Sequence, residues 1–201
     1  MEKTFLNAIK NRRSYYNLTD KSNISDEQII DIIHEIVKNA PSAFNSQSTR
    51  LVILLGENHK KFWNIVKDIL KKIAKSEEAF VKTEAKINNS FLAGYGTVLF
   101  YEDQETVQKL QEKFPSYKEN FVVWSQHTNA IHQILIWIAL EDEGFGASLQ
   151  HYNPLIDKAI EEEWGINHNW KLVAQMPFGI PADVPGEKSC ITVEDRVKVF
   201  I

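Results

Sequence analysis

The segment FVVWSQHTNAIHQILIWIALEDEGFGASLQHYN, from Phe121 to Asn153, determines how the rest of the chain is organised. Its middle, Ile134 to Leu140, is apolar on every side, so a helix formed there has no solvent face for about two turns. The run is far shorter than the roughly 20 apolar residues of a membrane span. We therefore predict a helix that is buried at the centre of the domain or in an interface.

The residues after this helix are predicted to form a loop that contacts a ligand. Gly144 suits the end of the helix, because glycine adopts the positive φ that a helix C-terminus often requires. The sequence GFG from Gly144 to Gly146 lacks the third glycine of a dinucleotide fingerprint and follows a helix, which argues against a Rossmann fold. Small residues let backbone approach a ligand closely, so the amides around Leu149, Gln150 and His151 are candidate donors.

Length and composition restrict the class of protein. The 201 residues suffice for one domain, residues 1–201, and 43% hydrophobic with 25% charged residues is ordinary for a globular protein. The net charge of −4 argues against nucleic-acid binding through general basicity. The single cysteine, Cys190, excludes an intramolecular disulfide and a cysteine zinc site. Without a signal-peptide core or a membrane span, we expect a cytoplasmic protein with no nucleic-acid or membrane partner.

Hydrophobic periodicity predicts an α+β fold with more helix than sheet. Ser25 and Gln28 match a capping box, which predicts a helix that begins there and ends before Pro41. The other predicted helices are Thr4 to Arg13, Asn58 to Ile73, Glu77 to Phe91, Glu105 to Lys113, and Pro154 to Glu163, with proline in the first turn of the last one. The predicted strands are Arg50 to Leu55, Gly96 to Tyr101, and Lys171 to Gln175, before a Pro/Gly-rich tail from Pro177 to Ser189. Ile191 to Phe200 is predicted to be a last strand or an extended arm.

A basic cluster at the end of the first predicted helix is a candidate phosphate site. Arg12, Arg13 and Ser14 suit a phosphate, because guanidinium groups bind phosphate oxygens with paired donors. The alternative is a solvated basic helix end that complements the helix dipole. Lys188, in the tail, is a second candidate cation.

The loop from Pro41 to Ser48 offers only amide and hydroxyl groups. Asn45 and Gln47 can supply donors and acceptors to a polar heterocycle or a polyol chain, unless such side chains bond their own turn. The six histidines lack the spacing of a metal site and no HExxH motif occurs, so we predict no metal.

In their order along the chain these segments resemble the FMN-dependent nitroreductase family: an RRS cluster, a PSAFNSQ loop before the first strand, a long apolar helix, and a lysine in a late Gly/Pro tail. The segments VWSQHT (123–128), GASLQHYNP (146–154) and EDRVKVF (194–200) are similar to the fatty-acid-repression-mutant branch of that family. The resemblance covers essentially the whole chain. It implies a nitroreductase-type α+β fold, with a mostly antiparallel central sheet surrounded by helices, in an obligate homodimer with two FMN sites at the subunit interface.

The resemblance also implies which residues bind the cofactor. They are Arg12, Arg13, Ser14 and Tyr16 at the FMN phosphate and ribityl chain, Asn45, Ser46 and Gln47 at the flavin of the other subunit, the backbone amides of Gln150 and His151 near the flavin N5, and Lys188 at the phosphate. The family often has basic residues where this chain has Tyr16 and Cys190, a loss for which Arg196 could compensate.

The implied activity is that of an NAD(P)H-dependent flavin oxidoreductase that reduces nitroaromatics or quinones by ping-pong hydride transfer through flavin N5. The cofactor carries the chemistry, so no catalytic side chain is expected. Trp124, Phe145 and Tyr117 are the predicted walls of a pocket for a small, flat aromatic acceptor. Three alternatives are a flavin-dependent reaction of another kind, a flavin-binding redox-response protein with incidental reductase activity, and a cofactor-free helical interaction domain.

Overall fold

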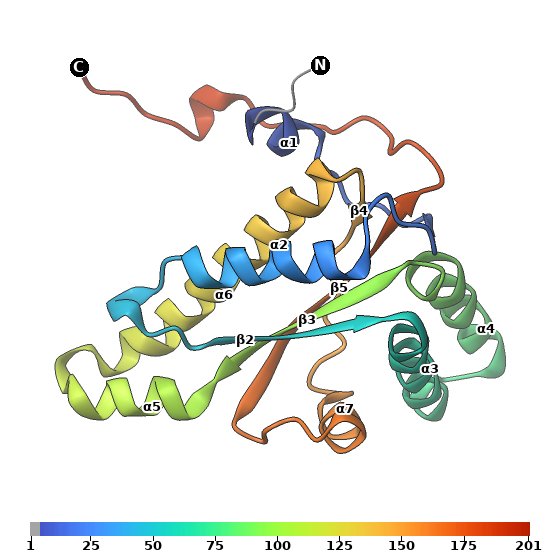
Figure 1. Cartoon of the computed structure of the whole chain (residues 1–201), viewed down its shortest axis with the longest axis horizontal. Coiled ribbons are helices and arrows are strands. Elements are labelled where there is room, and N and C mark those ends of the chain that lie inside the picture. The colour runs from blue at the N-terminus through green and yellow to red at the C-terminus, as the bar shows by residue number, and fades with distance from the viewer. Residues whose placement is uncertain (1–4) are drawn as a thin grey trace.

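An antiparallel sheet forms the centre of the computed structural model, which describes residues 5–201 (Figure 1). The strand order is β1-β5-β3-β2, and β4 pairs with β5 beyond this path. The strands are β1 (Leu18–Thr19), β2 (Thr49–Leu55), β3 (Gly96–Asp103), β4 (Gly146–Ala147) and β5 (Trp170–Pro181). The mostly antiparallel central sheet of the predicted α+β fold is confirmed.

Helices cover both faces of this sheet (Figure 1). They are α1 (Phe5–Asn11), α2 (Asp26–Asn39), α3 (Gly56–Ile73), α4 (Glu77–Lys86), α5 (Gln104–Lys113), α6 (Lys118–Asp142) and α7 (Asp157–Trp164). Shorter turns are η1 (Ala43–Asn45), η2 (Ile87–Leu92), η3 (Pro115–Tyr117) and η4 (Val193–Asp195).

The central strand β3 shows why the sheet needs helices on both faces. Successive side chains of a strand point to opposite faces. Val98 and Phe100 pack into one core with α2 and α6, whereas Leu99 and Tyr101 pack into a second core with α3 and α7. All eight residues of β3 are buried, so the strand reads as a continuous run rather than as an alternating pattern.

The long apolar helix of the sequence is α6, and it is only partly buried in one protomer. Ile136 and Leu140 lie in the core with exposures of 0% and 1%, but Ile134 is 41% exposed. Burial of the whole run inside the domain is therefore not observed, because within residues 5–201 no element covers its outer side at Ile134; burial in an interface stays a prediction. Gly144 takes a φ of +86° directly after the helix, as predicted.

Several local predictions are confirmed. Ser25 caps α2 in a complete capping box with Gln28, and the backbone leaves the helix at Ala40, before Pro41. Helices and strands lie within a few residues of the predicted ranges, except at the two places described next. Residue Thr4, where the first predicted helix begins, lies outside the described residues.

Two predicted boundaries are wrong. β5 does not stop at Gln175 but continues through Pro177 to Pro181, because Met176 and Phe178 are fully buried and β4 offers a further partner strand. Pro154 does not lie in the first turn of α7; it lies in the preceding turn, where its carbonyl accepts a bond from the N–H of Asp157.

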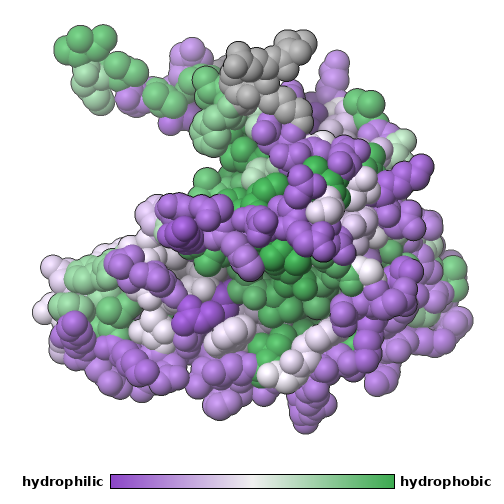
Figure 2. Space-filling model, in the orientation of Figure 1, coloured by the Kyte–Doolittle hydropathy of each residue, from purple (hydrophilic) through white to green (hydrophobic). Residues whose placement is uncertain are grey.

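The chain after β5 forms an arm rather than a strand. Apart from the turn η4 it has no regular structure, and it passes over α1 and ends away from the rest of the protomer (Figure 1). Apolar side chains along it are open to solvent, among them Val199 at 73% and Phe200 at 94% (Figure 2). Within residues 5–201, no helix has both the length and the hydrophobicity that a membrane crossing requires.

Candidate functional site

The loop after α1 and the loop after α6 lie side by side. The N–H of Tyr15 donates to the carbonyl of Ala147 at 3.0 Å, and Ser14 forms a β-bridge with the same residue. Gly146 makes this approach possible, since a Cβ there would stand 2.7 Å from the ring of Tyr15. The fold therefore joins the candidate phosphate cluster to the candidate amide donors, although more than 130 residues separate them in the sequence.

Arg12 is held by an aromatic ring rather than by a carboxylate. Its guanidinium carbon lies 4.4 Å from the centre of the Trp137 ring. Stacking on a ring face leaves the N–H groups at the guanidinium edge free to donate. Neither Arg12 nor Arg13 has an ion-pair partner among the described residues. An unneutralised pair of guanidiniums is suited to an anion.

The arm is tied to the same loop. Arg13 donates from Nη2 to the carbonyl of Gly186 at 2.7 Å, and Asn17 donates to Asp183 at 3.3 Å. The bonded residue Gly186 lies two positions before Lys188 in the sequence, and Lys188 is exposed. A cavity of about 450 Å³ lies between loop and arm. It is lined by Arg13, Ser14, Tyr15, Tyr16, Asn17 and residues 183–187.

Backbone amides after β4 alternate in direction. Gln150 pairs with Gln175 in the register that β4 has already set, Gly146 opposite Gly179. The N–H groups of Ser148 and Gln150 donate to β5 carbonyls, at 3.3 and 2.7 Å, and that of Tyr152 donates to the side chain of Gln175 at 2.8 Å. Because consecutive amides of an extended chain point to opposite sides, the N–H groups of Leu149 and His151 face away from β5.

This geometry leaves only one of the two predicted amide donors available to a ligand. The N–H of Gln150 is already used inside the fold, so it is not a donor to a ligand in this conformation. His151 is exposed, and within residues 5–201 its N–H has no partner. His151, with Leu149 beside it, is the amide that remains available.

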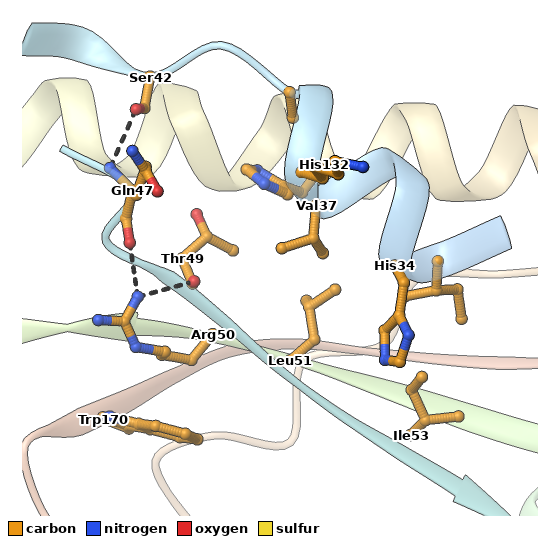
Figure 3. A pocket seen from close by; sticks show the side chains of 13 residues that line it. His34, Val37, Ser42, Gln47, Thr49, Arg50, Leu51, Ile53, His132 and Trp170 are labelled. Carbon is orange, nitrogen blue, oxygen red and sulfur yellow. Dashed lines mark hydrogen bonds between the residues drawn. The ribbon is translucent and has the colours of Figure 1, made fainter. Parts of the chain in front are cut away.

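The loop from Asn45 to Gln47 has an unusual backbone. Phe44, Asn45 and Gln47 have φ values of 55°, 50° and 49°, a left-handed conformation that costs a non-glycine residue about 1–2 kcal/mol. Ser42 Oγ accepts from the N–H of Gln47 at 3.0 Å, and Arg50 donates to the carbonyl of Gln47 at 2.5 Å (Figure 3). The loop is therefore fixed from both ends.

A cavity of about 430 Å³ lies beside this loop, between α2 and β2 (Figure 3). Its floor is apolar, with Val37, Leu51 and Ile53, and its rim is polar, with Gln47 and Arg50. Figure 2 shows the apolar area over β2, below the polar surface of α2. An apolar floor with a polar rim is the usual composition of a small-molecule or docking site.

A buried carboxylate, which the sequence analysis missed, anchors the end of the loop. Glu102 is 0% exposed and accepts from Ser48 Oγ at 2.6 Å, Thr49 Oγ1 at 2.5 Å and Asn129 Nδ2 at 3.0 Å. Its neighbour Asp103 pairs with Arg50 at 2.8 Å. The sequence pattern does not reveal such a group, because its donors come from Ser48, from Thr49 at the start of β2 and from Asn129 on α6, and meet only in the fold.

Aromatic residues surround Phe44. Trp124 is stacked on it at 5.9 Å with an interplanar angle of 19°, and Tyr117 lies 5.9 Å away. A groove of about 410 Å³ is lined by Phe44, Trp124, His127 and Ile131, among others. Phe145, by contrast, is a core residue, 2% exposed and 5.4 Å from Phe178, so its predicted place in a pocket wall does not fit this protomer.

One protomer thus brings some predicted site residues together and leaves others apart. Residues 13–15 contact Ala147 and the arm. The loop Asn45–Gln47 follows the C-terminal end of α2, and the cavity beside it shares no lining residue with the cavity between residues 13–17 and the arm. Among the described residues, no group of three or more His, Cys, Asp or Glu side chains is placed to hold a metal ion.

Comparison with known proteins connects these features to one family. The Nitroreductase family profile matches residues 9–180. The chain is 37% identical over 190 residues to nitroreductase FRM2 of Saccharomyces cerevisiae, over 93% of both proteins. Nitroreductase CinD from Lactococcus lactis, solved with chloramphenicol and with 4-nitrophenol, is 42% identical, with TM-scores of 0.88 and 0.87 over 98% of this chain and 100% of that one. A nitroreductase structure from S. cerevisiae is 35% identical, with a TM-score of 0.75 over 87% of this chain and 94% of that one.

A more distant structure shares the fold alone. It is a protein from Exiguobacterium sibiricum 255-15 in complex with FMN, 14% identical to this chain, with a TM-score of 0.70 over 100% of this chain and 99% of that one.

Proposed function

The chain belongs to the Nitroreductase family, and on this basis we propose that it is an FMN-dependent oxidoreductase that uses NAD(P)H to reduce nitroaromatics or quinones. The observation that carries the proposal is the bond between Tyr15 and Ala147. It joins the loop that carries two guanidiniums without carboxylate partners to the segment that carries outward-facing backbone amides, which supports a ligand with a phosphate at one end and a polar ring edge at the other.

The residues present fit FMN on their donor chemistry. The Arg12 guanidinium, stacked on Trp137, and the Ser14 hydroxyl are suited to phosphate oxygens. Arg13 retains further donors besides the one bonded to Gly186. Lys188 follows in the tethered arm and adds a third cation close to this loop.

When held by these residues, FMN would supply the redox chemistry, which is hydride transfer through N5 between NAD(P)H and the acceptor in a ping-pong cycle. The chain's own part is positioning and electrostatics. The amide of His151 is placed to donate to a ring edge, and fixed N–H dipoles stabilise negative charge without reorganisation. Trp124 and Tyr117 lie around Phe44, next to the loop that a second copy would bring to the site, and offer flat faces on which an aromatic acceptor can stack.

We also propose that the chain acts as a homodimer. Phe5 and Leu6 on α1 are 62% and 63% exposed, and Ile134 on α6 is 41% exposed. An apolar cavity of about 360 Å³ between α1, α2 and α6 includes Leu135 and Ile138. Contiguous apolar surface of this kind marks interaction sites. A second copy would cover it, and would bring its own Asn45–Gln47 loop to a site that one protomer leaves without that loop.

The substrate class rests on the relatives. CinD was solved with chloramphenicol and with 4-nitrophenol, both of which carry a nitrophenyl group. The aromatic groove around Phe44 and Trp124 suits such a ring.

Titration of the purified protein with FMN tests the cofactor proposal. A hydrogen bond to a charged group is worth about 1.5–3 kcal/mol, so we expect Arg12→Ala to raise the FMN dissociation constant by about tenfold to a hundredfold. Lys10→Ala, which removes an exposed cation two residues earlier on α1, serves as the control and should change the constant little. Equal affinities of the parent and Arg12→Ala would refute the phosphate assignment.

A further inference from the structure

Gln175 is fully buried in β5, yet all its hydrogen-bonding groups are bonded to one short segment. Its backbone N–H donates to the carbonyl of Gln150 at 2.9 Å, and its carbonyl accepts from the Gln150 N–H at 2.7 Å. Its side-chain oxygen accepts from the N–H of Tyr152 at 2.8 Å, and its side-chain nitrogen donates to Asn153 Oδ1 at 3.1 Å. The exposed fraction of Gln175 is 0%.

A buried amide at this position needs an explanation. Its neighbours Ala174 and Met176 are apolar and also 0% exposed, and an apolar side chain would be buried here at no polar cost. The two side-chain bonds of Gln175 replace strand pairing beyond Gln150. The β-bridge ends at Gln150, and the side chain of Gln175 bonds the two residues Tyr152 and Asn153 in place of backbone pairing.

The consequence is a fixed direction for the intervening amide. The His151 N–H shares a trans peptide with the Gln150 carbonyl, which accepts from the Gln175 N–H, so the His151 N–H points away from β5. Rotation of this peptide group would break the bond between the Gln150 carbonyl and the Gln175 N–H. The side-chain bonds of Gln175 to Tyr152 and Asn153 hold the chain in place at the end of that bridge.

We propose that Gln175 is a positioning residue for the flavin: by holding Gln150 and Tyr152 it aims the His151 N–H at the edge of the bound ring. This inference rests on the proposed function, because the ligand at that amide is the proposed FMN. Gln175 does not itself touch the ligand; it acts through the backbone of residues 150–153.

Hydrogen exchange of single amides, read by NMR, tests the orientation without any turnover. In the FMN-free parent we expect slow exchange at Gln150 and Tyr152 and fast exchange at His151. Added FMN should slow His151 and leave the other two unchanged. Slow exchange at His151 without FMN, or no change on saturation with FMN, would overturn the proposal.

Gln175→Met then removes both side-chain bonds while keeping the length of an unbranched chain. We expect the Tyr152 amide to lose its protection, the flavin midpoint potential to shift, and the FMN dissociation constant to rise about threefold to tenfold, the worth of roughly one hydrogen bond. Gln175→Glu keeps an oxygen for the Tyr152 N–H, and in its protonated form a donor for Asn153, so it should restore the parent values at least in part.

Phe80→Leu controls for lost stability, because Phe80 is buried on α4, at a distance from β4 and β5 (Figure 1). Phe80→Leu should lower the unfolding temperature about as much as Gln175→Met does, but it should leave the FMN affinity and the flavin midpoint potential unchanged. A parent that binds FMN while Gln175→Met keeps its affinity and potential would refute the role of Gln175 and leave the proposed function intact. A parent that binds no FMN would refute the proposed function, and the exchange pattern of the FMN-free protein would still decide whether the His151 amide faces outward.

Discussion

Replacing Thr49 with valine tests the buried carboxylate network most sharply. Valine has nearly the shape of threonine and suits a β-strand, so the change removes little except the hydroxyl that donates to Glu102 at 2.5 Å. Thr49 is 6% and Glu102 0% exposed, so water does not replace the lost donor. A hydrogen bond to a charged group contributes about 1.5–3 kcal/mol, and we expect Thr49→Val to lower the free energy of unfolding by about 2 kcal/mol.

The assay is urea denaturation at one fixed protein concentration, because a dimer makes apparent stability depend on concentration. Thr49→Ser is the matched variant: it keeps the hydroxyl and loses one methyl group, so it should cost about 1 kcal/mol or less. Thr106→Val, which removes a bond to Asp103 from a partly exposed threonine, should also cost less. If Thr49→Val costs under about 0.5 kcal/mol, or no more than Thr49→Ser, the network does not hold the loop as inferred.

Two further predictions concern the glycines and a buried histidine. A methyl group at Gly179 would overlap the carbonyl oxygen of Thr19, so Gly179→Ala should lower the unfolding free energy by about 1–3 kcal/mol, whereas Gly186→Ala, with open space around it, should be nearly neutral; equal thermal midpoints would contradict this. Burial lowers the pKa of His59 to about 4, below the ordinary value of about 6.5, so the unfolded chain takes up the proton first as the pH falls. This contribution to stability is complete near pH 7 and should fall by about 2 kcal/mol by pH 5; His59→Gln should lack that decline, the control His34→Gln on exposed α2 should keep it, and identical pH profiles of His59→Gln and parent would refute the assignment.

Much of the fold could be predicted from local signals. The capping box at Ser25 and the glycine at position 144 act within a few residues, so the sequence reveals them directly. The end of β5 could not be predicted in this way. Pro177 reads as a strand breaker, but the partner strands that bury its neighbours come from elsewhere in the chain.

The candidate site could likewise be predicted only where local signals sufficed. Arg12 and Ser14 were recognised from their chemistry, but the stack on Trp137 and the contact with Ala147 join distant segments and appear only in the structure. Gln150 was predicted as a donor from a motif, and its N–H is consumed by strand pairing that no motif records. The exposed side of α6 at Ile134 likewise depends on what the protomer leaves uncovered.

The absorbance spectrum of the FMN-loaded protein, recorded anaerobically before and after NADH or NADPH, tests the proposed function most directly. We predict flavin bands that stay with the protein through gel filtration, bleach with at least one nicotinamide, and return when a nitroaromatic or a quinone is added. A protein that stays colourless after incubation with FMN, or whose flavin bands persist with both nicotinamides, would contradict the account.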